Sequence, residues 1–337
     1  MINPFFLDAL VMAISRCRKC GSLAEHPGEL VGSAQQCPQC GTPVDVYDTT
    51  FYVGKLLEQF FATRQELSQL KAAMSPTAPV AAATSTLSFD IHNTSYFSSE
   101  SQHRSILDWL RGMGIVGTIN AASVDTTGFF DEAAVAIGSD YGLLGPICER
   151  IRYAQQKELS STLVYLDKKS EEEAKALEAF ARRLHQYSLV TRYFVNKPEN
   201  NIRLIVQNAP GVRRFFAGEW LEWFALMSVL RICKERGIDF SCARNLTLSM
   251  AGDEKRELDV FFLLRNEQPL YIECKSGEFR QDLAKYVALR KRLKIDARYF
   301  VVCVAGMDID QAKGLRAMYD MTFVNTETLA EHVATLT

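Results

Sequence analysis

Two runs decide the fold of this 337-residue sequence, Leu258-Asp-Val-Phe-Phe-Leu-Leu264 and Leu270-Tyr-Ile-Glu-Cys-Lys275. Both are short, apolar and rich in aromatic and branched residues, which is typical of strands buried in a sheet. The segment between them, Arg265-Asn-Glu-Gln-Pro269, has the composition of a turn. The two runs are therefore expected to pair as an antiparallel hairpin.

Polar residues interrupt both runs at places where polarity is costly. Asp259 lies in the first run, and Glu273 and Lys275 lie in the second. A carboxylate in such surroundings is unfavourable unless it is paired or binds a metal. Alternation puts Glu273 and Lys275 on one face, and hairpin pairing brings Asp259 close to Glu273. Two adjacent carboxylates suit Mg2+ or Mn2+, and a nearby lysine can orient water or stabilise charge developing on phosphorus.

A glutamate in the segment before the hairpin adds a further candidate. Phe216–Arg236 is expected to be an apolar helix, and Glu222 lies within it. Glu219 is three residues earlier and shares the same helix face, so it competes for the same role. Glu257 shares a strand face with Asp259 and is expected to be a secondary ligand or a salt-bridge partner.

The remaining elements of this third of the chain complete an α/β pattern. Leu246–Met250 is expected to be a strand, and Phe279–Leu293 a basic helix. Tyr299–Ala305 is almost continuously apolar, as in a central buried strand, and a helix is expected after it. The segment therefore predicts a sheet flanked by helices.

The ordered set of motifs resembles the PD-(D/E)xK nuclease superfamily. Gly218-Glu-Trp-Leu-Glu222, Glu257-Leu-Asp-Val260 and Ile272-Glu-Cys-Lys-Ser-Gly277 are similar to the nuclease domain of CRISPR ancillary, cyclic-oligoadenylate-activated nucleases and their stand-alone relatives. The resemblance covers residues 212–337. It implies a restriction-endonuclease-like mixed sheet flanked by helices.

The resemblance also implies roles for four residues. Asp259 and Glu273 match the acids that hold a catalytic Mg2+ or Mn2+, and Lys275 matches the catalytic lysine. Glu222 matches the helix glutamate and is favoured over Glu219 because it occupies the Trp-Leu-Glu position. The relatives carry a sensor domain before the nuclease, and residues 87–211 show no convincing match to it. Activation by a cyclic nucleotide is therefore not carried over.

The implied activity is hydrolysis of phosphodiester bonds by a metal-activated water. The expected substrate is nucleic acid, with DNA favoured, and the expected setting is defence against foreign DNA. RNA is an alternative substrate because the chemistry is directed at phosphate. A second alternative is a nucleic-acid-binding adaptor or sensor in which the nuclease fold is structural and inactive.

Basic side chains cluster just after the hairpin, in the expected helix Phe279–Leu293 and the residues that follow it. They are Arg280, Lys285, Arg290, Lys291, Arg292 and Lys294. Such a row beside the site is expected to contact the phosphate backbone, with little sequence specificity. The alternative is a solvated helix face.

Four of the nine cysteines form a tight pattern near the amino terminus. Cys17-Arg-Lys-Cys20-Gly21 and Cys37-Pro-Gln-Cys40-Gly41 are two Cys-x-x-Cys-Gly turns. Two thiolates separated by two residues reach one ion, and the glycine permits positive φ. The pattern predicts a closed four-cysteine site for one structural Zn2+, in a ribbon that folds only with its metal. The ribbon is expected to bind nucleic acid or to mediate assembly.

The rest of the chain divides into two segments. Residues 53–74 have apolar positions at helical spacing, which predicts an amphipathic helix that packs on its own domain or forms a homodimer; a small, proline-bearing linker follows to residue 86. The expected domains are 1–50, 51–86, 87–211 and 212–337, the third being an α/β domain of unknown role. Its expected strands are Ile115–Ile119, Ala133–Ile137, Thr162–Leu166, Leu189–Val195 and Ile202–Val206, and its expected helices are Ser101–Arg111, Leu143–Lys157 and Ser170–Tyr187.

Composition narrows the class of protein. The formal net charge is −2, so a nucleic-acid site must be a local patch rather than a property of the whole surface. The hydrophobic fraction of 47% is ordinary for a folded protein, and neither a signal peptide nor a membrane helix is expected. The other five cysteines are scattered, which favours a reducing cytoplasm over a disulfide framework.

Overall fold

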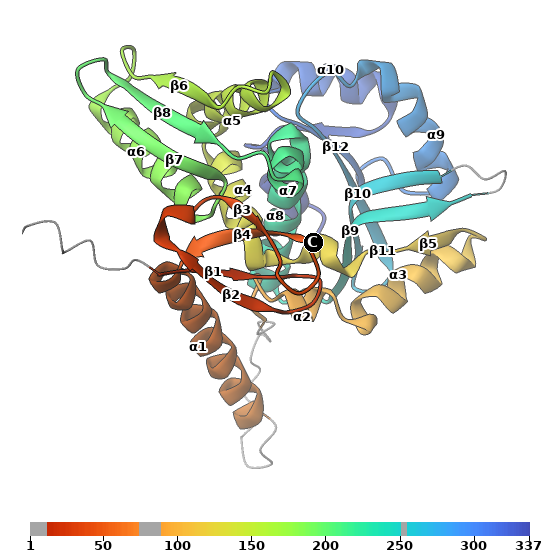
Figure 1. The fold of residues 1–337 in the computed structure, drawn as a ribbon. Helices are drawn as coiled ribbons and strands as arrows, with labels where there is room; N and C mark the ends of the chain where they lie inside the picture. The colour runs from red at the N-terminus through yellow and green to blue at the C-terminus, as the bar shows by residue number, and fades with distance from the viewer. Residues whose placement is uncertain (1–11, 74–88, 251–254) are drawn as a thin grey trace, which may run out of the picture. The chain divides into compact units, whose positions relative to one another are not determined.

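The computed structural model describes residues 12–73, 89–250 and 255–337, which form two compact units (Figure 1). Unit 1 contains the chain through Phe61 and then Gly142–Ala217, and unit 2 contains Ala62–Tyr141 and Gly218–Thr337. These units divide the expected segment 87–211. Its residues up to Tyr141 belong to unit 2, with the hairpin, and its residues from Gly142 belong to unit 1, with the cysteine ribbon. None of the helices in the described ranges has an apolar stretch sufficient to cross a bilayer.

Unit 2 is built on a six-stranded mixed sheet in the order β13-β12-β11-β10-β9-β5. The strands are β5 (Val116–Thr118), β9 (Phe240–Ser249), β10 (Lys255–Leu264), β11 (Gln268–Lys275), β12 (Phe300–Val304) and β13 (Thr322–Val324). β9, β10 and β11 pair antiparallel, and Val260 lies opposite Ile272. β12 pairs parallel with β11 and β13. The expected hairpin and the expected mixed α/β fold are confirmed.

Helices cover both faces of this sheet (Figure 1). Side chains of α3 (Glu100–Gly112) and α9 (Leu283–Leu293) share one buried cluster with β9, β10, β11 and β12. α8 (Trp220–Arg236) contributes nothing to that cluster and packs on β9, β10 and β11 from the other side, where α4 (Phe130–Ser139) and α11 (Leu329–Ala334) contact it. The remaining helices are α2 (Thr94–Phe97) and α10 (Ile309–Tyr319).

One expectation for this unit was wrong. Ala133–Ile137 was expected to be a strand but lies in α4, because Asp131 and Glu132 in the first turn stabilise a helix start and the apolar side chains pack on α8. Gly138 permits this packing, since a Cβ there would collide with the ring of Phe224. The three-residue strand β13 was not foreseen.

Unit 1 contains two small sheets. The first has the order β2-β1-β4-β3, from β1 (Met12–Arg16), β2 (Leu23–Pro27), β3 (Ala34–Gln36) and β4 (Pro43–Asp48). The second has the order β6-β8-β7, from β6 (Ser161–Tyr165), β7 (Val190–Asn196) and β8 (Asn201–Val206). Its helices are α5 (Tyr141–Gln156), α6 (Glu171–Gln186) and α7 (Pro210–Arg214). Ser170 and Glu173 form the capping box of α6, as the expected start at Ser170 requires.

The ribbon sheet docks directly on the second sheet of unit 1. Gly32 has φ +80°, and a Cβ there would lie 2.7 Å and 2.8 Å from the carbonyl oxygens of Thr191 and Val190. The Ser188 hydroxyl donates to the Val46 carbonyl at 2.5 Å, and the Gln207 amide donates to the Gly32 carbonyl at 3.2 Å. Only glycine allows this approach, so the ribbon is an integral part of unit 1.

The expected amphipathic helix corresponds to α1 (Thr49–Ala73). Its base is fixed by ring contacts of Tyr52 with Tyr47 and of Phe51 with Tyr187. Val53, Leu56, Leu57 and Phe60 share one side of the helix and are exposed. The expected linker, together with Met74, lies outside the described residues.

Candidate active site

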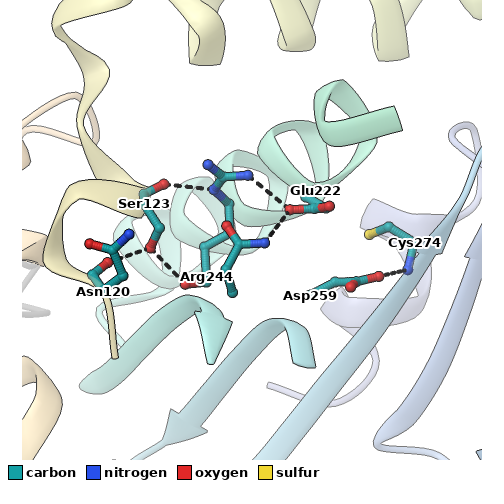
Figure 2. Close-up of polar contacts among 7 residues, drawn as sticks. Asn120, Ser123, Glu222, Arg244, Asp259 and Cys274 are labelled. Atoms are coloured by element: carbon teal, nitrogen blue, oxygen red, sulfur yellow. Dashed lines mark hydrogen bonds and ion pairs between the residues drawn. The ribbon is translucent and has the colours of Figure 1, made fainter. Parts of the chain in front are cut away.

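The hairpin brings Asp259 beside the main chain of the second strand. Its Oδ2 accepts a hydrogen bond of 2.7 Å from the amide of Cys274, as Figure 2 shows. Asp259 immediately precedes Val260, the first residue of β10 whose pairing with β11 is regular. The carboxylate therefore occupies the point where the two strands begin to separate, and it is half-buried there.

Glu273 and Lys275 form an ion pair on one face of β11. The ammonium of Lys275 lies 2.8 Å from Oε1 of Glu273, and the hydroxyl of Tyr271 donates to Oε2. Glu273 is only 6% exposed, whereas Lys275 is half-buried. Burial acts to lower the pKa of Lys275, but the charge of Glu273 and the hydrogen bond to it raise that pKa above its ordinary value. Lys275 is therefore a cation in this arrangement.

Glu222 lies on α8 and is held by two neighbouring residues of β9. Its Oε2 accepts hydrogen bonds from Nη1 of Arg244 at 2.8 Å and from Nδ2 of Asn245 at 2.9 Å. Arg244 is itself fixed, because its Nε donates to the Ser123 carbonyl at 2.7 Å (Figure 2). Its guanidinium also lies 4.4 Å from the ring centre of Trp223. Glu222 is thus a fully oriented carboxylate.

A break in strand alternation allows adjacent residues to reach the same carboxylate. In a regular strand, every second residue faces the same side. In β9, Ala243 and Leu246 both belong to the buried cluster under α3 and α9, so two residues lie between them instead of one. Asn245 has φ +54°, which breaks the pleat at this point. In β10 the same cluster takes Leu258 and then Phe261, so Asp259 lies in a matching irregularity.

The carboxylates influence one another electrostatically. Burial raises the pKa of Asp259 well above its ordinary value, and the charges of Glu273 and Glu222 raise it further. Burial raises the pKa of Glu222 to about 7, with Arg244 opposing the rise and Glu219 adding to it. A carboxylate whose ionisation is disfavoured by burial and by nearby negative charge is a setting in which a bound cation restores the charged form.

Asp259 and Glu273 fit a divalent cation as a pair of hard oxygen donors. Within the described ranges, no set of three carboxylates brings its ligand atoms within 4.8 Å of one another. Glu222 is engaged by Arg244 and Asn245, and Glu257 is exposed. Asp259 and Glu273 therefore remain the predicted ligands of a divalent cation, with water or phosphate expected in its other positions.

The expected basic residues do not all face solvent. Arg290 donates to Asp320 at 2.5 Å and to the Ile295 carbonyl at 3.2 Å. Lys285 pairs with Asp282, and Arg280 with Glu278. Lys291, Arg292 and Lys294 are exposed at the end of α9.

The four ribbon cysteines are brought together as expected. The Sγ atoms of Cys17, Cys20, Cys37 and Cys40 all lie within 4.8 Å of one another. Gly21 and Gly41 have φ of +73° and +68°, as the two tight turns require. Four thiols so placed suit a tetrahedral ion, and Zn2+ prefers such a ligand set. Hydrogen bonding with Thr42 lowers the pKa of the Cys40 thiol to about 6, whereas burial and the neighbouring thiols raise that of Cys20 to about 12.

Several residues of the site were not identified from the sequence. Arg244 is a charged residue inside the apolar strand Phe240–Ser249, the same signal that marked Asp259. The hydroxyl of Tyr271, two residues before Glu273, shares its strand face. Ser123 and the conformation of Asn245 carry no such signal, because both depend on long-range packing.

Comparisons with known proteins bear on the fold alone. Neither the protein-family models nor the curated proteins contain a match. Among solved structures, the chain is similar to protein VC1899 from Vibrio cholerae, with 20% identity and a TM-score of 0.46 over 68% of this chain and 60% of that one. It is also similar to Can2 from Sulfobacillus thermosulfidooxidans in complex with cyclic tetra-adenylate, with 14% identity and a TM-score of 0.46 over 68% and 59%. The chain therefore spans about three fifths of the length of either protein.

Proposed function

We propose that this protein is a metal-dependent nuclease that hydrolyses phosphodiester bonds. The observation that carries the proposal is the ion pair of 2.8 Å between Glu273 and Lys275 on β11. The amide of Cys274, which lies between these two residues, donates a hydrogen bond to Asp259. One buried and one half-buried carboxylate, with a fixed cation at a strand end, suit chemistry at phosphate. The resemblance in sequence to PD-(D/E)xK nucleases involves the same residues.

Asp259 and Glu273 are the residues that would hold Mg2+ or Mn2+. When bound, such an ion supplies a Lewis acid for the phosphate and lowers the pKa of water. Tyr271 orients Glu273 through its hydroxyl, and the Cys274 amide orients Asp259. These two contacts fix the carboxylates before substrate arrives, which is the preorganisation that a catalytic site needs.

Lys275 has a different role in this proposal. Because Glu273 keeps it protonated, Lys275 stabilises negative charge that develops on the phosphate rather than removing a proton from water. Glu222 is held as a hydrogen-bond acceptor by Arg244 and Asn245, and its free oxygen is available to position water. DNA is the proposed substrate and defence against foreign DNA the proposed setting, both from the resemblance.

The test is cleavage of labelled single- and double-stranded DNA and RNA with Mg2+, with Mn2+ and without added metal. Glu273→Ala and Lys275→Ala are each expected to reduce the rate by at least ~100-fold, as for loss of a group that acts in the transition state. Glu267→Gln is the matched control, because Glu267 is an exposed carboxylate in the turn of the same hairpin. It is expected to retain the wild-type rate.

Two outcomes would contradict the proposal. Equal cleavage by wild type and by both alanine variants would place the activity elsewhere. Tight binding of nucleic acid without cleavage under any metal condition would favour the adaptor, in which the nuclease fold is structural. Preference for RNA over DNA would retain the chemistry and correct the substrate.

A further inference from the structure

The second sheet of unit 1 has one covered face and one open face. α6 packs on β7 and β8, and Val164, Ile202 and Leu204 are buried on that side. Alternation directs the intervening residues to the opposite side. There Arg203, on the central strand β8, is exposed, although a central strand is normally the best covered. This side of the sheet is therefore open to solvent.

Aromatic and basic side chains lie next to one another across the open face. Arg203 of β8 is paired in register with Phe194 of β7 and with Leu163 of β6. Phe194 is 52% exposed, and so is Tyr165, two residues beyond Leu163 on the same strand face. The three strands thus present two aromatic rings on a partly apolar floor, at a separation set by the strand spacing.

The arginines of the open face are held by neighbouring groups, but none of these groups is a carboxylate. Nε and Nη2 of Arg203 both donate to the Ser161 hydroxyl, at 3.3 Å and 3.2 Å, which holds the guanidinium against the sheet. Arg150 of α5 lies 5.6 Å from the ring centre of Tyr165. Arg192 is exposed two residues before Phe194, and its Nη2 donates to the Glu29 carbonyl at 3.5 Å. Within the ranges that the structure describes, none of these three arginines has a carboxylate partner.

The chemistry of this face selects a ligand with both planar rings and negative charge. Exposed aromatic rings stack on bases that are not paired, and unneutralised arginines contact the phosphates between them. A duplex would satisfy the arginines but would leave the rings without partners, since its bases are stacked inside. An apolar protein partner would desolvate three guanidinium groups without supplying a negative charge to any of them, which is costly.

We propose that the open face, formed by Tyr165, Arg192, Phe194 and Arg203 with Arg150 at its edge, binds single-stranded nucleic acid. This site lies within unit 1, whereas the proposed catalytic residues lie within unit 2. The inference goes beyond the proposed nuclease, and binding can be measured without cleavage. It gives the α/β segment after the ribbon a role that its sequence alone did not reveal.

The experiment measures fluorescence anisotropy of labelled single-stranded DNA, single-stranded RNA of the same sequence, and the DNA duplex. The full chain carries Glu273→Ala throughout, so that no probe is cut. Phe194→Leu is expected to weaken single-strand binding by about 5- to 100-fold, because stacking on one ring is lost, and Phe194→Tyr is expected to restore it. Arg203→Gln is expected to weaken binding and to reduce the slope of log K against log salt by about 0.7.

Arg182→Gln is the matched control, because Arg182 is an exposed arginine of α6, the helix that packs on the covered side of the sheet. It is expected to bind as the parent does. The inference is overturned if the parent does not bind single strands, if Phe194→Leu weakens duplex binding as much as single-strand binding, or if Phe194→Leu and Phe194→Tyr behave alike. Failure of the proposed function would appear separately, as absence of cleavage by the wild type with binding intact.

Discussion

Arg244 determines the environment of Glu222 more than any other residue of the site. Its side chain is 6% exposed and that of Glu222 is 14% exposed, so the pair is largely desolvated. Removing one partner of such a pair leaves an uncompensated buried charge. Arg244→Gln is therefore expected to lower the free energy of unfolding by about 3–5 kcal/mol, measured by urea denaturation.

The control for this prediction lies on α8 itself. Arg231 is exposed, so Arg231→Gln is expected to leave the unfolding free energy within about 0.5 kcal/mol of the wild type. Adding Glu222→Gln to Arg244→Gln removes the unpaired charge and should recover part of the loss. A double variant as unstable as Arg244→Gln would show that the lost stability comes from packing against Trp223 instead.

The stability of the protein is also expected to depend on pH through Glu222. Burial raises the pKa of Glu222 from 4.5 to about 7, so the folded chain binds more protons than the unfolded chain between these values. The free energy of unfolding should therefore fall as pH rises through this window. Glu222→Gln should flatten that fall, as seen in urea titrations at several pH values. An unchanged slope would contradict the assigned pKa.

The polar residues of the site differ in how far the sequence predicts them. Asp259 and Glu273 stand out because they interrupt apolar runs, and Arg244 carries the same signal. The positive φ of Asn245 has no such signal in the sequence, because this conformation depends on the pairing of β9 with β10 and not on local propensity. Local patterns identify which polar groups are buried, but not which of them meet.

At the scale of elements, α9 carries basic residues in two different settings. Arg290 is fixed by Asp320 and Ile295, so Arg290→Gln is expected to reduce thermal stability with little effect on nucleic-acid affinity. Lys291→Gln with Arg292→Gln should do the opposite, weakening binding and lowering the salt slope by about 0.9 per lost duplex phosphate contact. Anisotropy at several salt concentrations, with melting curves, tests both. Equal affinity of the double variant and wild type would make this end of α9 a solvated face.

The exposed side of α1 predicts self-association. Val53, Leu56 and Leu57 lie at helical spacing and are exposed, although α1 is anchored at its base. Leu56→Glu is expected to convert a dimer into a monomer, measured as molar mass by light scattering. Ala62→Glu adds the same charge off this stripe and should leave the dimer intact. A monomeric wild type would refute the homodimer, which remains a prediction, as does a larger defence complex.

Whether a segment forms a helix or a strand is predictable from the sequence where its hydrophobic pattern is long. The helices α5, α6 and α8 and the hairpin β10–β11 have clear periodicity or caps. The apolar run Ala133–Ile137 is too short to distinguish a strand from a helix, and the packing of α4 on α8 decides it. The pairing of β5 with β9 joins Val116 to Ser249, a contact that no local pattern encodes.

At the scale of the molecule, the ribbon metal is expected to support all of unit 1. Cys17→Ser and Cys37→Ser should each reduce bound zinc from one ion per chain to none and lower the melting temperature, because the ribbon docks on β7 through Gly32. Cys148→Ala is the control, since Cys148 is a buried thiol outside the cluster and should retain one zinc. Retention of zinc by the ligand variants would refute the site.

The ribbon has a further consequence for how the protein is made. Unit 1 is discontinuous, since residues 62–141 of unit 2 are synthesised between its two parts. At ~5–20 residues per second, the ribosome needs on the order of ten seconds to pass from the last ribbon strand to β7, the strand that Gly32 contacts. During that interval the nascent ribbon lacks the sheet on which it docks. Zinc loading is therefore predicted to be an early step of biosynthesis, and zinc-starved cells are expected to accumulate chains whose first unit does not assemble.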